Sequence, residues 1–251
     1  MALPRIRILA TGGTIAGETC PGGDITRYRA GVRPVEALLT AVPELGALAT
    51  LDAEQILSLD SKDMTPDDWL CMLSAARQAL ADPAIDGLVL LHGTDTLEES
   101  AYFLHLALPT GKPVVLTGAM RPADHPEADG PANLLAAVKL AASAEGVGKG
   151  VLVVMNGKPH GARHVRKART SGLDAFESDP DWTTARPDGR FASLAPAPLP
   201  RVDILPGYAG APAKLIDACV ADGAQGLVLA LSGHGSVPSA WEPSLRRARE
   251  H

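Results

Sequence analysis

Short, almost continuously apolar runs alternate with helix-length segments along much of the chain, and this order admits few folds. The apolar runs predict strands at residues 5–11, 87–92, 113–118 and 150–155. The segments between them predict helices at residues 66–81, 97–107 and 131–144. Strands that are apolar on both faces and alternate with helices are typical of a mostly parallel sheet covered on both sides. We therefore predict an α/β fold.

The segments that follow three of these strands carry most of the polar chemistry. The strand at 5–11 leads into GGTIAG, the strand at 87–92 into GTDT, and the strand at 113–118 into AMRP. Ligands of open parallel sheets bind outside the carboxyl ends of the strands. We expect these three loops to meet at one edge of the sheet and to form a binding site there.

A change of pattern near residue 180 divides the chain. The sequence predicts an N-terminal domain over residues 1–180, a linker over residues 181–201 that is rich in Pro, Asp, Thr and Arg, and a smaller α/β domain over residues 202–251. The smaller domain is expected to hold strands at 202–205 and 226–231, a helix at 212–222 and a helix after Pro238. A further strand-helix-strand unit would complete such a domain, so we expect this one to be partial.

Charge and composition exclude several classes of partner. The chain has 23 Lys and Arg against 29 Asp and Glu, and the resulting net charge of −6 repels a polyphosphate backbone. No apolar run is long enough to span a bilayer, and the first residues enter a strand pattern rather than a signal peptide. Cys20, Cys71 and Cys219 lack metal-ligand spacing. We predict a cytoplasmic protein with no metal, no cofactor, and no nucleic-acid or membrane partner.

The glycine-rich turn TGGTIAG at residues 11–17 has three interpretations. It could cradle a dinucleotide, form an ordinary tight turn, or expose Thr14 as a nucleophile or binding hydroxyl. It matches neither GxGxxG nor GxxxxGK[ST], the two patterns that hold phosphates.

The segment HGTDTLEE at residues 92–99 places a hydroxyl beside a carboxylate where a strand ends and a helix begins. Thr96 and Glu99 have the spacing of a capping box, which predicts that they cap the helix. Thr94 is not needed for that cap, and its place at the positive end of a helix suits an anionic ligand group. His92 ends an apolar strand, and we interpret it as a core histidine rather than a catalyst.

Five segments together resemble one known family. They are ILATGGTIAG at 8–17, LDSKDM at 59–64, LLHGTDTLEESAYFL at 90–104, TGAMRP at 117–122 and GVLVVMN at 150–156. In this order they are similar to the bacterial-type L-asparaginases, amidohydrolases that include the glutaminase-asparaginases. The resemblance covers most of residues 5–176 and extends more weakly to about residue 237. It implies a flavodoxin-like N-terminal domain, a smaller C-terminal α/β domain, and a homo-oligomer, either a dimer or a tetramer.

The resemblance also implies catalytic roles for individual residues. Thr14 matches the nucleophile that attacks the side-chain amide of L-asparagine and forms an acyl-threonine intermediate, from which water releases L-aspartate. Tyr28 matches the tyrosine of a mobile active-site loop that partners this threonine. Thr94, Asp95 and Lys167 match a hydrogen-bonded set that activates either the nucleophile or the water. Without the resemblance, the loop around Tyr28 would be interpreted as a plain flexible loop and the basic run around Lys167 as a solvated one.

Substrate binding is implied for Ser61, Thr94 and Asp95, which match residues that hold the α-carboxylate and α-ammonium of the amino acid. Lys62 departs from the family, because many relatives have Gln or Glu there, close to the α-ammonium. Either Lys62 turns toward solvent or the ligand differs. Family sites are closed by an asparagine and a glutamate of a neighbouring subunit. Ser236 is the nearest counterpart of that asparagine, and the glutamate has no counterpart in this sequence.

The leading hypothesis is therefore a cofactor-free amidohydrolase that converts L-asparagine to L-aspartate and ammonia, with L-glutamine as a second candidate substrate. The main alternative is a truncated relative that binds an amino acid without catalysis. A third interpretation, a nucleotide-binding α/β protein, rests on the glycine-rich turn alone.

Overall fold

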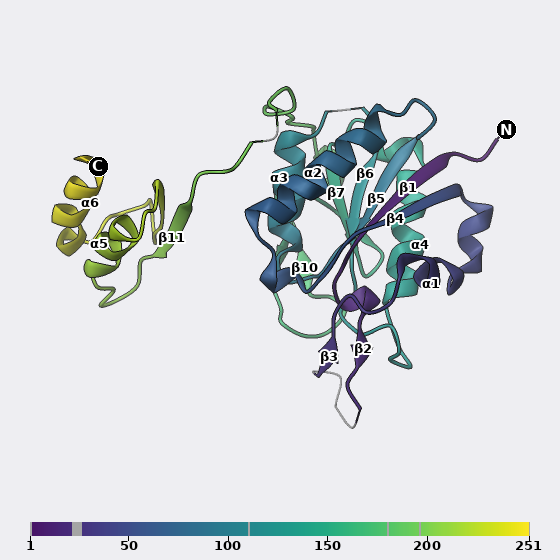
Figure 1. The fold of residues 1–251 in the computed structure, drawn as a ribbon, viewed down its shortest axis with the longest axis horizontal. Helices are drawn as coiled ribbons and strands as arrows, with labels where there is room; N and C mark the ends of the chain where they lie inside the picture. The colour runs from purple at the N-terminus through teal and green to yellow at the C-terminus, as the bar shows by residue number, and fades with distance from the viewer. Residues whose placement is uncertain (1, 22–26, 110, 180, 196, 251) are drawn as a thin grey trace. The chain divides into compact units, whose positions relative to one another are not determined.

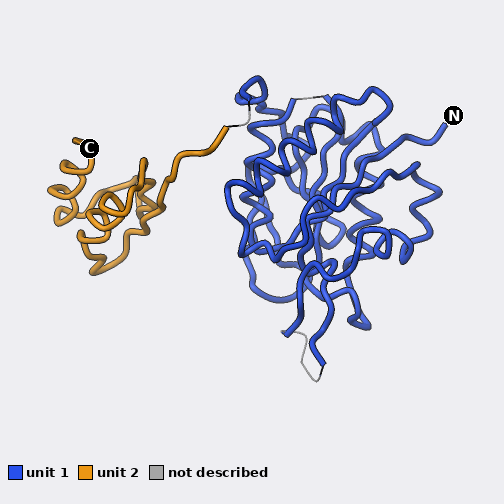
Figure 2. The backbone as a smooth tube through the Cα atoms, in the orientation of Figure 1, with its two compact units in different colours: residues 1–196 blue, residues 197–251 orange. Residues whose placement is uncertain are grey.

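The computed structural model describes residues 2–21, 27–109, 111–179, 181–195 and 197–250. The chain forms two compact units, Met1–Pro196 and Ala197–His251, shown in different colours in Figure 2. In the part of the chain that is described, no helix is both long and apolar enough to cross a membrane.

Unit 1 is built on a six-stranded sheet. Its strands, in spatial order, are β4 (Thr50–Leu59), β1 (Arg5–Gly12), β5 (Gly87–Leu91), β6 (Val114–Thr117), β7 (Val151–Met155) and β8 (Lys158–Gly161). All neighbours pair in parallel except β7 and β8, which are antiparallel. The five parallel strands, numbered along the chain, have the flavodoxin-like order 2-1-3-4-5. The strand order therefore reverses between β1 and β5, which is where such folds bind ligands.

Helices cover both faces of this sheet (Figure 1). On one face, α2 (Pro66–Ala81) and α3 (Leu97–Ala107) pack against Leu88 and Leu90 of β5. On the other, α1 (Val35–Thr40) and α4 (Gly130–Ala141) pack against Val89 and Leu91. All four β5 side chains are fully buried, which explains why this strand is apolar at every position. The predicted mostly parallel sheet flanked by helices is confirmed.

Among the described residues, three pairs of short strands lie outside the main sheet. In unit 1, β2 (Glu18–Thr19) pairs with β3 (Tyr28–Arg29), and β9 (Arg166–Lys167) pairs with β10 (Phe176–Glu177), both antiparallel. In unit 2, β11 (Val202–Pro206) pairs in parallel with β12 (Gly226–Ala230). With α5 (Lys214–Ala221) and α6 (Glu242–Glu250) these strands enclose a small core around Leu205, Ile216 and Trp241. A smaller C-terminal α/β unit is thus present.

The segment assigned to a linker is partly packed on unit 1. Trp182 and Ala185 contact the apolar core below α1 and α4. The backbone N–H of Phe191 donates to the carbonyl of Leu106 at the end of α3. The division between the compact units falls after residue 196, inside the segment of residues 181–201 that was predicted as a linker. Apolar packing of Trp182 together with this backbone hydrogen bond holds the segment on unit 1, which its polar composition does not reveal.

Asn133 fixes two of the loops at the carboxyl edge of the sheet. This buried side chain of α4 donates to the Gly118 carbonyl and to the Asp129 carboxylate, both at 3.0 Å. Its Oδ1 accepts the backbone N–H of Asn156 at 2.9 Å. The loops after β6 and β7 are therefore both held by α4.

We expect Asn133→Ala to destabilise the protein, because it removes the side-chain donor to the buried Gly118 carbonyl and the acceptor of the Asn156 N–H. Loss of the partner of a buried polar group costs about 1–3 kcal/mol. Urea unfolding of the variant beside Lys139→Ala, an exposed position on the same helix, measures the effect. Equal unfolding free energies for the two variants would contradict this account of the loops.

Candidate functional site

The backbones that follow β1 and β5 touch at the point where the strand order reverses. Gly13 has a φ of 78°, and a Cβ built there would lie 2.4 Å from the Cα of Gly93. A Cβ on Gly93 would lie 2.6 Å from the Oγ of Ser61. Only glycine fits at either position, because a side chain would force these backbones apart. Thr14 and Thr94, the next residues along each segment, are thereby brought to the same edge of the sheet, as the loop arrangement predicted.

Thr14 lies in a short 3₁₀ helix (Thr14–Ala16) and is 5% exposed. Its hydroxyl is hydrogen-bonded to the hydroxyl of Tyr28, with 2.7 Å between the oxygens. Tyr28 belongs to β3 and pairs with Thr19 of β2, whose backbone N–H and hydroxyl donate to Asp124 at 3.0 and 2.9 Å. The predicted contact between Thr14 and Tyr28 is thus present. The predicted lid includes residues 22–26, which lie outside the described residues.

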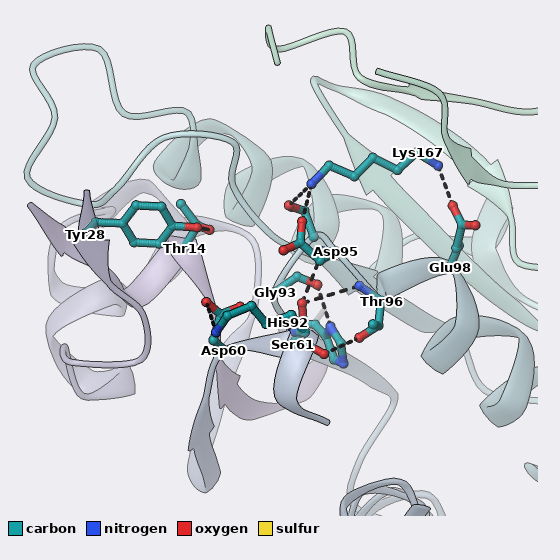
Figure 3. Close-up of polar contacts among 12 residues, drawn as sticks. Thr14, Tyr28, Asp60, Ser61, His92, Gly93, Asp95, Thr96, Glu98 and Lys167 are labelled. Atoms are coloured by element: carbon teal, nitrogen blue, oxygen red, sulfur yellow. Dashed lines mark hydrogen bonds and ion pairs between the residues drawn. The ribbon is translucent and has the colours of Figure 1, made fainter. Parts of the chain in front are cut away.

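Lys167 joins the residues that follow β5 (Figure 3). Its ammonium donates to the Thr94 hydroxyl at 2.9 Å and to the Asp95 carboxylate at 2.6 Å. Thr94 is 5% exposed, and the side chains of Lys167 and Asp95 are 17% and 51% exposed. The structure therefore brings together the three residues that the resemblance grouped. It also adds Glu98, whose carboxylate accepts the backbone N–H of Lys167 and for which the sequence had suggested no role.

Ser61 belongs to the segment between β4 and α2 and contacts the residues just before α3. Its buried Oγ accepts the backbone N–H groups of Asp95 at 3.1 Å and Thr96 at 3.4 Å. The Thr96 hydroxyl donates to the Ser61 carbonyl at 2.8 Å and makes no capping bond within its own helix. The predicted capping box of Thr96 and Glu99 is therefore wrong. The tertiary contact with Ser61 draws the Thr96 side chain away from the helix.

Lys62 points away from these hydroxyls. Its ammonium lies 3.1 Å from Asp60 and 2.7 Å from Asp63, and its side chain is 58% exposed. The carboxylates of Asp63 and Asp60 raise the pKa of Lys62 above its usual range. Of the two explanations for Lys62, the structure supports the one in which it turns toward solvent.

His92 lies fully buried beneath the loop after β5. Its Nδ1 is 2.7 Å from the Gly93 carbonyl, so this nitrogen carries the proton. Its Nε2 has no hydrogen-bond partner among the described residues. Burial lowers the pKa of His92 to about 4. A neutral, buried ring fits the interpretation of His92 as a core histidine.

The described residues contain no group of three or more His, Cys, Asp or Glu side chains placed to hold a metal ion. The groups that meet at this edge include the buried hydroxyls of Thr14, Ser61 and Thr94, the Lys167 ammonium and the partly exposed Asp95 carboxylate.

Two family models match the sequence of this chain. The model described as "Asparaginase, N-terminal" matches residues 5–193, and the model described as "Glutaminase/Asparaginase C-terminal domain" matches residues 201–251. The matches include both compact units.

Individual proteins are similar over nearly the whole chain. "L-asparaginase 2" of Bacillus subtilis strain 168 is 43% identical over 256 residues, which cover 96% of this chain and 68% of that protein. "Probable L-asparaginase periplasmic" of Haemophilus influenzae is 39% identical over 264 residues, covering 98% and 74%. Among solved structures, "Probable Cytoplasmic L-asparaginase from Campylobacter jejuni" is similar with a TM-score of 0.89 at 38% identity, covering 98% of this chain and 81% of that one.

The buried imidazole of His92 predicts a loss of stability in mild acid. The pKa of His92 is lower in the folded protein than its ordinary value of 6.5, so between pH 6.5 and about 4 the unfolded chain binds more protons. The free energy of unfolding should therefore fall as the pH falls through this window, by at most about 1.4 kcal/mol per pH unit for this residue. His105 and His160, whose pKa values are also lowered by burial, act in the same direction.

Urea unfolding at about pH 7 and about pH 5 measures this dependence in the wild type and in His92→Asn. Asparagine retains a donor for the Gly93 carbonyl but does not titrate, so the variant should lose less stability on acidification. A variant as acid-sensitive as the wild type would show that His92 is not buried in its neutral form.

Proposed function

Because this chain belongs to the asparaginase family, we propose that it hydrolyses the side-chain amide of L-asparagine to L-aspartate and ammonia. The observation that supports the proposal best is the convergence of Lys167 on Thr94 and Asp95. It occurs at the same reversal point of the sheet at which the hydroxyl of Thr14 meets that of Tyr28. Both hydroxyls thus have a partner that can orient them or move their proton.

In the first proposed step, the Oγ1 of Thr14 attacks the carbonyl carbon of the amide. A C–O bond forms, the C–N bond breaks, and the proton of the hydroxyl passes to the leaving nitrogen, which departs as ammonia. In the second step, water adds to the acyl-threonine ester, regenerates the Thr14 hydroxyl and releases the carboxylate of aspartate. The hydrogen bond between the hydroxyls of Thr14 and Tyr28 fixes the orientation of Thr14 for this attack.

Lys167 is the proposed base of the second set. In its neutral form it can take the proton of Thr94, while Asp95 orients the amine and balances its charge once it is protonated. This set activates either the attacking Thr14 or the water of the second step.

The amino-acid end of the substrate is assigned to Ser61, Thr94 and Asp95. The Oγ of Ser61 already accepts two backbone N–H groups, so its own hydroxyl proton remains to be donated to the α-carboxylate. The half-exposed carboxylate of Asp95 can bind the α-ammonium. Both contacts aim the side-chain amide toward Thr14.

Localisation and assembly stay predictions. The relative from Campylobacter jejuni is named cytoplasmic and the one from Haemophilus influenzae periplasmic, so the similarity supports both compartments. A homo-oligomer, either a dimer or a tetramer, also stays a prediction for this chain. L-glutamine remains a candidate substrate, since "Glutaminase-asparaginase" of Pseudomonas fluorescens is 34% identical.

We expect the purified chain to release ammonia from L-asparagine, and Thr14→Val to release none. Thr94→Val should lower kcat by about 10²–10⁴-fold, the usual contribution of a general acid–base group. Ammonia release from L-asparagine, L-glutamine and D-asparagine measures both effects.

The matched control is Thr11→Val, the same substitution at the end of β1. Thr11 is buried and donates to the Leu91 carbonyl at 2.9 Å, so its loss should reduce stability but not turnover. Wild-type turnover in Thr94→Val would overturn the role of the Lys167 set. Stabilisation of the folded wild type by L-asparagine without ammonia release would favour the alternative, an amino-acid-binding protein that does not catalyse.

A further inference from the structure

Lys167 is held at both of its ends by a single stretch of chain (Figure 3). Its ammonium binds Thr94 and Asp95 in the loop after β5, and its backbone N–H donates to the carboxylate of Glu98. Glu98 lies in the first turn of α3, one helical turn beyond Thr94. Thr94 and Asp95 bind the Lys167 side chain, and Glu98 binds its backbone. All three lie at the start of α3, so their positions relative to one another are fixed.

The backbone around Lys167 needs this support, because its own secondary structure is small. β9 has two residues and pairs only with the two residues of β10, in a sheet separate from the main one. An isolated pair of short strands is marginally stable in water. Burial of the flanking Val165 and Phe176 attaches this pair to the core, but neither contact sets the position of the Lys167 nitrogen. A hydrogen bond to a carboxylate is among the stronger ones available for that purpose.

We propose that Glu98 is a positioning residue that fixes the backbone of Lys167, so that its amine reaches the Thr94 hydroxyl. This inference rests on the proposed function, in which Lys167 is the base of the second hydroxyl. A long, flexible side chain samples many rotamers, and anchoring its backbone limits the positions that its amine can reach. Glu98 acts through Lys167 and does not touch the substrate.

A second role of Glu98 must be separated from this one. Carboxylates in the first turn of a helix are favoured by the helix dipole, and α3 has two of them, Glu98 and Glu99. Of these two glutamates, Glu98 accepts the backbone N–H of Lys167, whereas Glu99 is exposed and has no such contact among the described residues. Glu99→Leu therefore removes one first-turn charge without touching Lys167, and it is the matched control for Glu98→Leu.

The kinetic test compares four variants on L-asparagine. Glu98→Leu should lower kcat by about 10²-fold, the scale of a misplaced catalytic group, with a smaller change in KM. Glu98→Gln keeps an oxygen that can accept the Lys167 N–H and should restore most of kcat. Glu98→Asp keeps the first-turn charge and the fold but is too short to reach, so it should also lose kcat. Glu99→Leu should turn over at the wild-type rate.

Amide hydrogen exchange at Lys167, measured by NMR, supplies a readout that needs no activity. Exchange should be faster in Glu98→Leu and Glu98→Asp than in the wild type, and unchanged in Glu99→Leu and Glu98→Gln. Equal exchange in all variants overturns the inference, and so does an equal loss of kcat in Glu98→Leu and Glu99→Leu. A wild type that releases no ammonia overturns the proposed function instead, and the exchange comparison still decides whether Glu98 fixes Lys167.

Discussion

The contact between the backbones of Gly13 and Gly93 is the constraint on which the rest of the site depends. A parallel sheet keeps neighbouring strands about 4.8 Å apart, and where the strand order reverses the two loops diverge because their helices lie on opposite faces. Here β1 and β5 are neighbours, and the absence of side chains at both glycines lets their loops touch before they separate. Ser61, the residue that a Cβ on Gly93 would strike, adds a third segment to the same contact. Three distant parts of the chain therefore meet where the strand order reverses.

The start of α3 carries more of the site than its length suggests. A helix leaves its first N–H groups without internal partners, and most helices satisfy them with a nearby side chain. Just before α3, the Oγ of Ser61 instead accepts the N–H groups of Asp95 and Thr96, and the Thr96 hydroxyl donates in return to the Ser61 carbonyl. The local residues are thereby released from capping, which leaves Thr94, Asp95 and the carboxylate of Glu98 free to hold Lys167. The Ser61 contact and the contacts of Lys167 thus both lie at the start of α3.

In the main sheet, the central strands were predictable from the sequence, and the two edge strands were not. β5 is covered on both faces and is apolar at every position, so its pattern is unambiguous. β4 and β8 lie at the edges of the sheet with mixed burial, and their sequences do not distinguish them from loops. Motif resemblance grouped Thr94, Asp95 and Lys167, but the contact from Glu98 spans 69 positions and depends on the bend between β8 and β9. No local pattern encodes such a contact. The same holds for the bond from the Thr96 hydroxyl to the Ser61 carbonyl, which replaces the predicted cap of α3.

The distribution of charge follows from the cost of burying an ion. The floor of the site consists of neutral groups that are at most 5% exposed: the hydroxyls of Thr14, Ser61 and Thr94, and the imidazole of His92. The ionisable Asp95 and Lys167 lie at the rim, where water reduces the cost of their charge. A buried hydroxyl without a nearby base is a poor nucleophile, so the proposed chemistry requires that a rim group extend inward. The lysine side chain is long enough to have its backbone fixed at Glu98 and its amine at Thr94. In a site whose floor is neutral and whose charged groups lie at the rim, a long side chain such as Lys167, with its backbone held at one point, can bring a base to the buried hydroxyl without a buried charge.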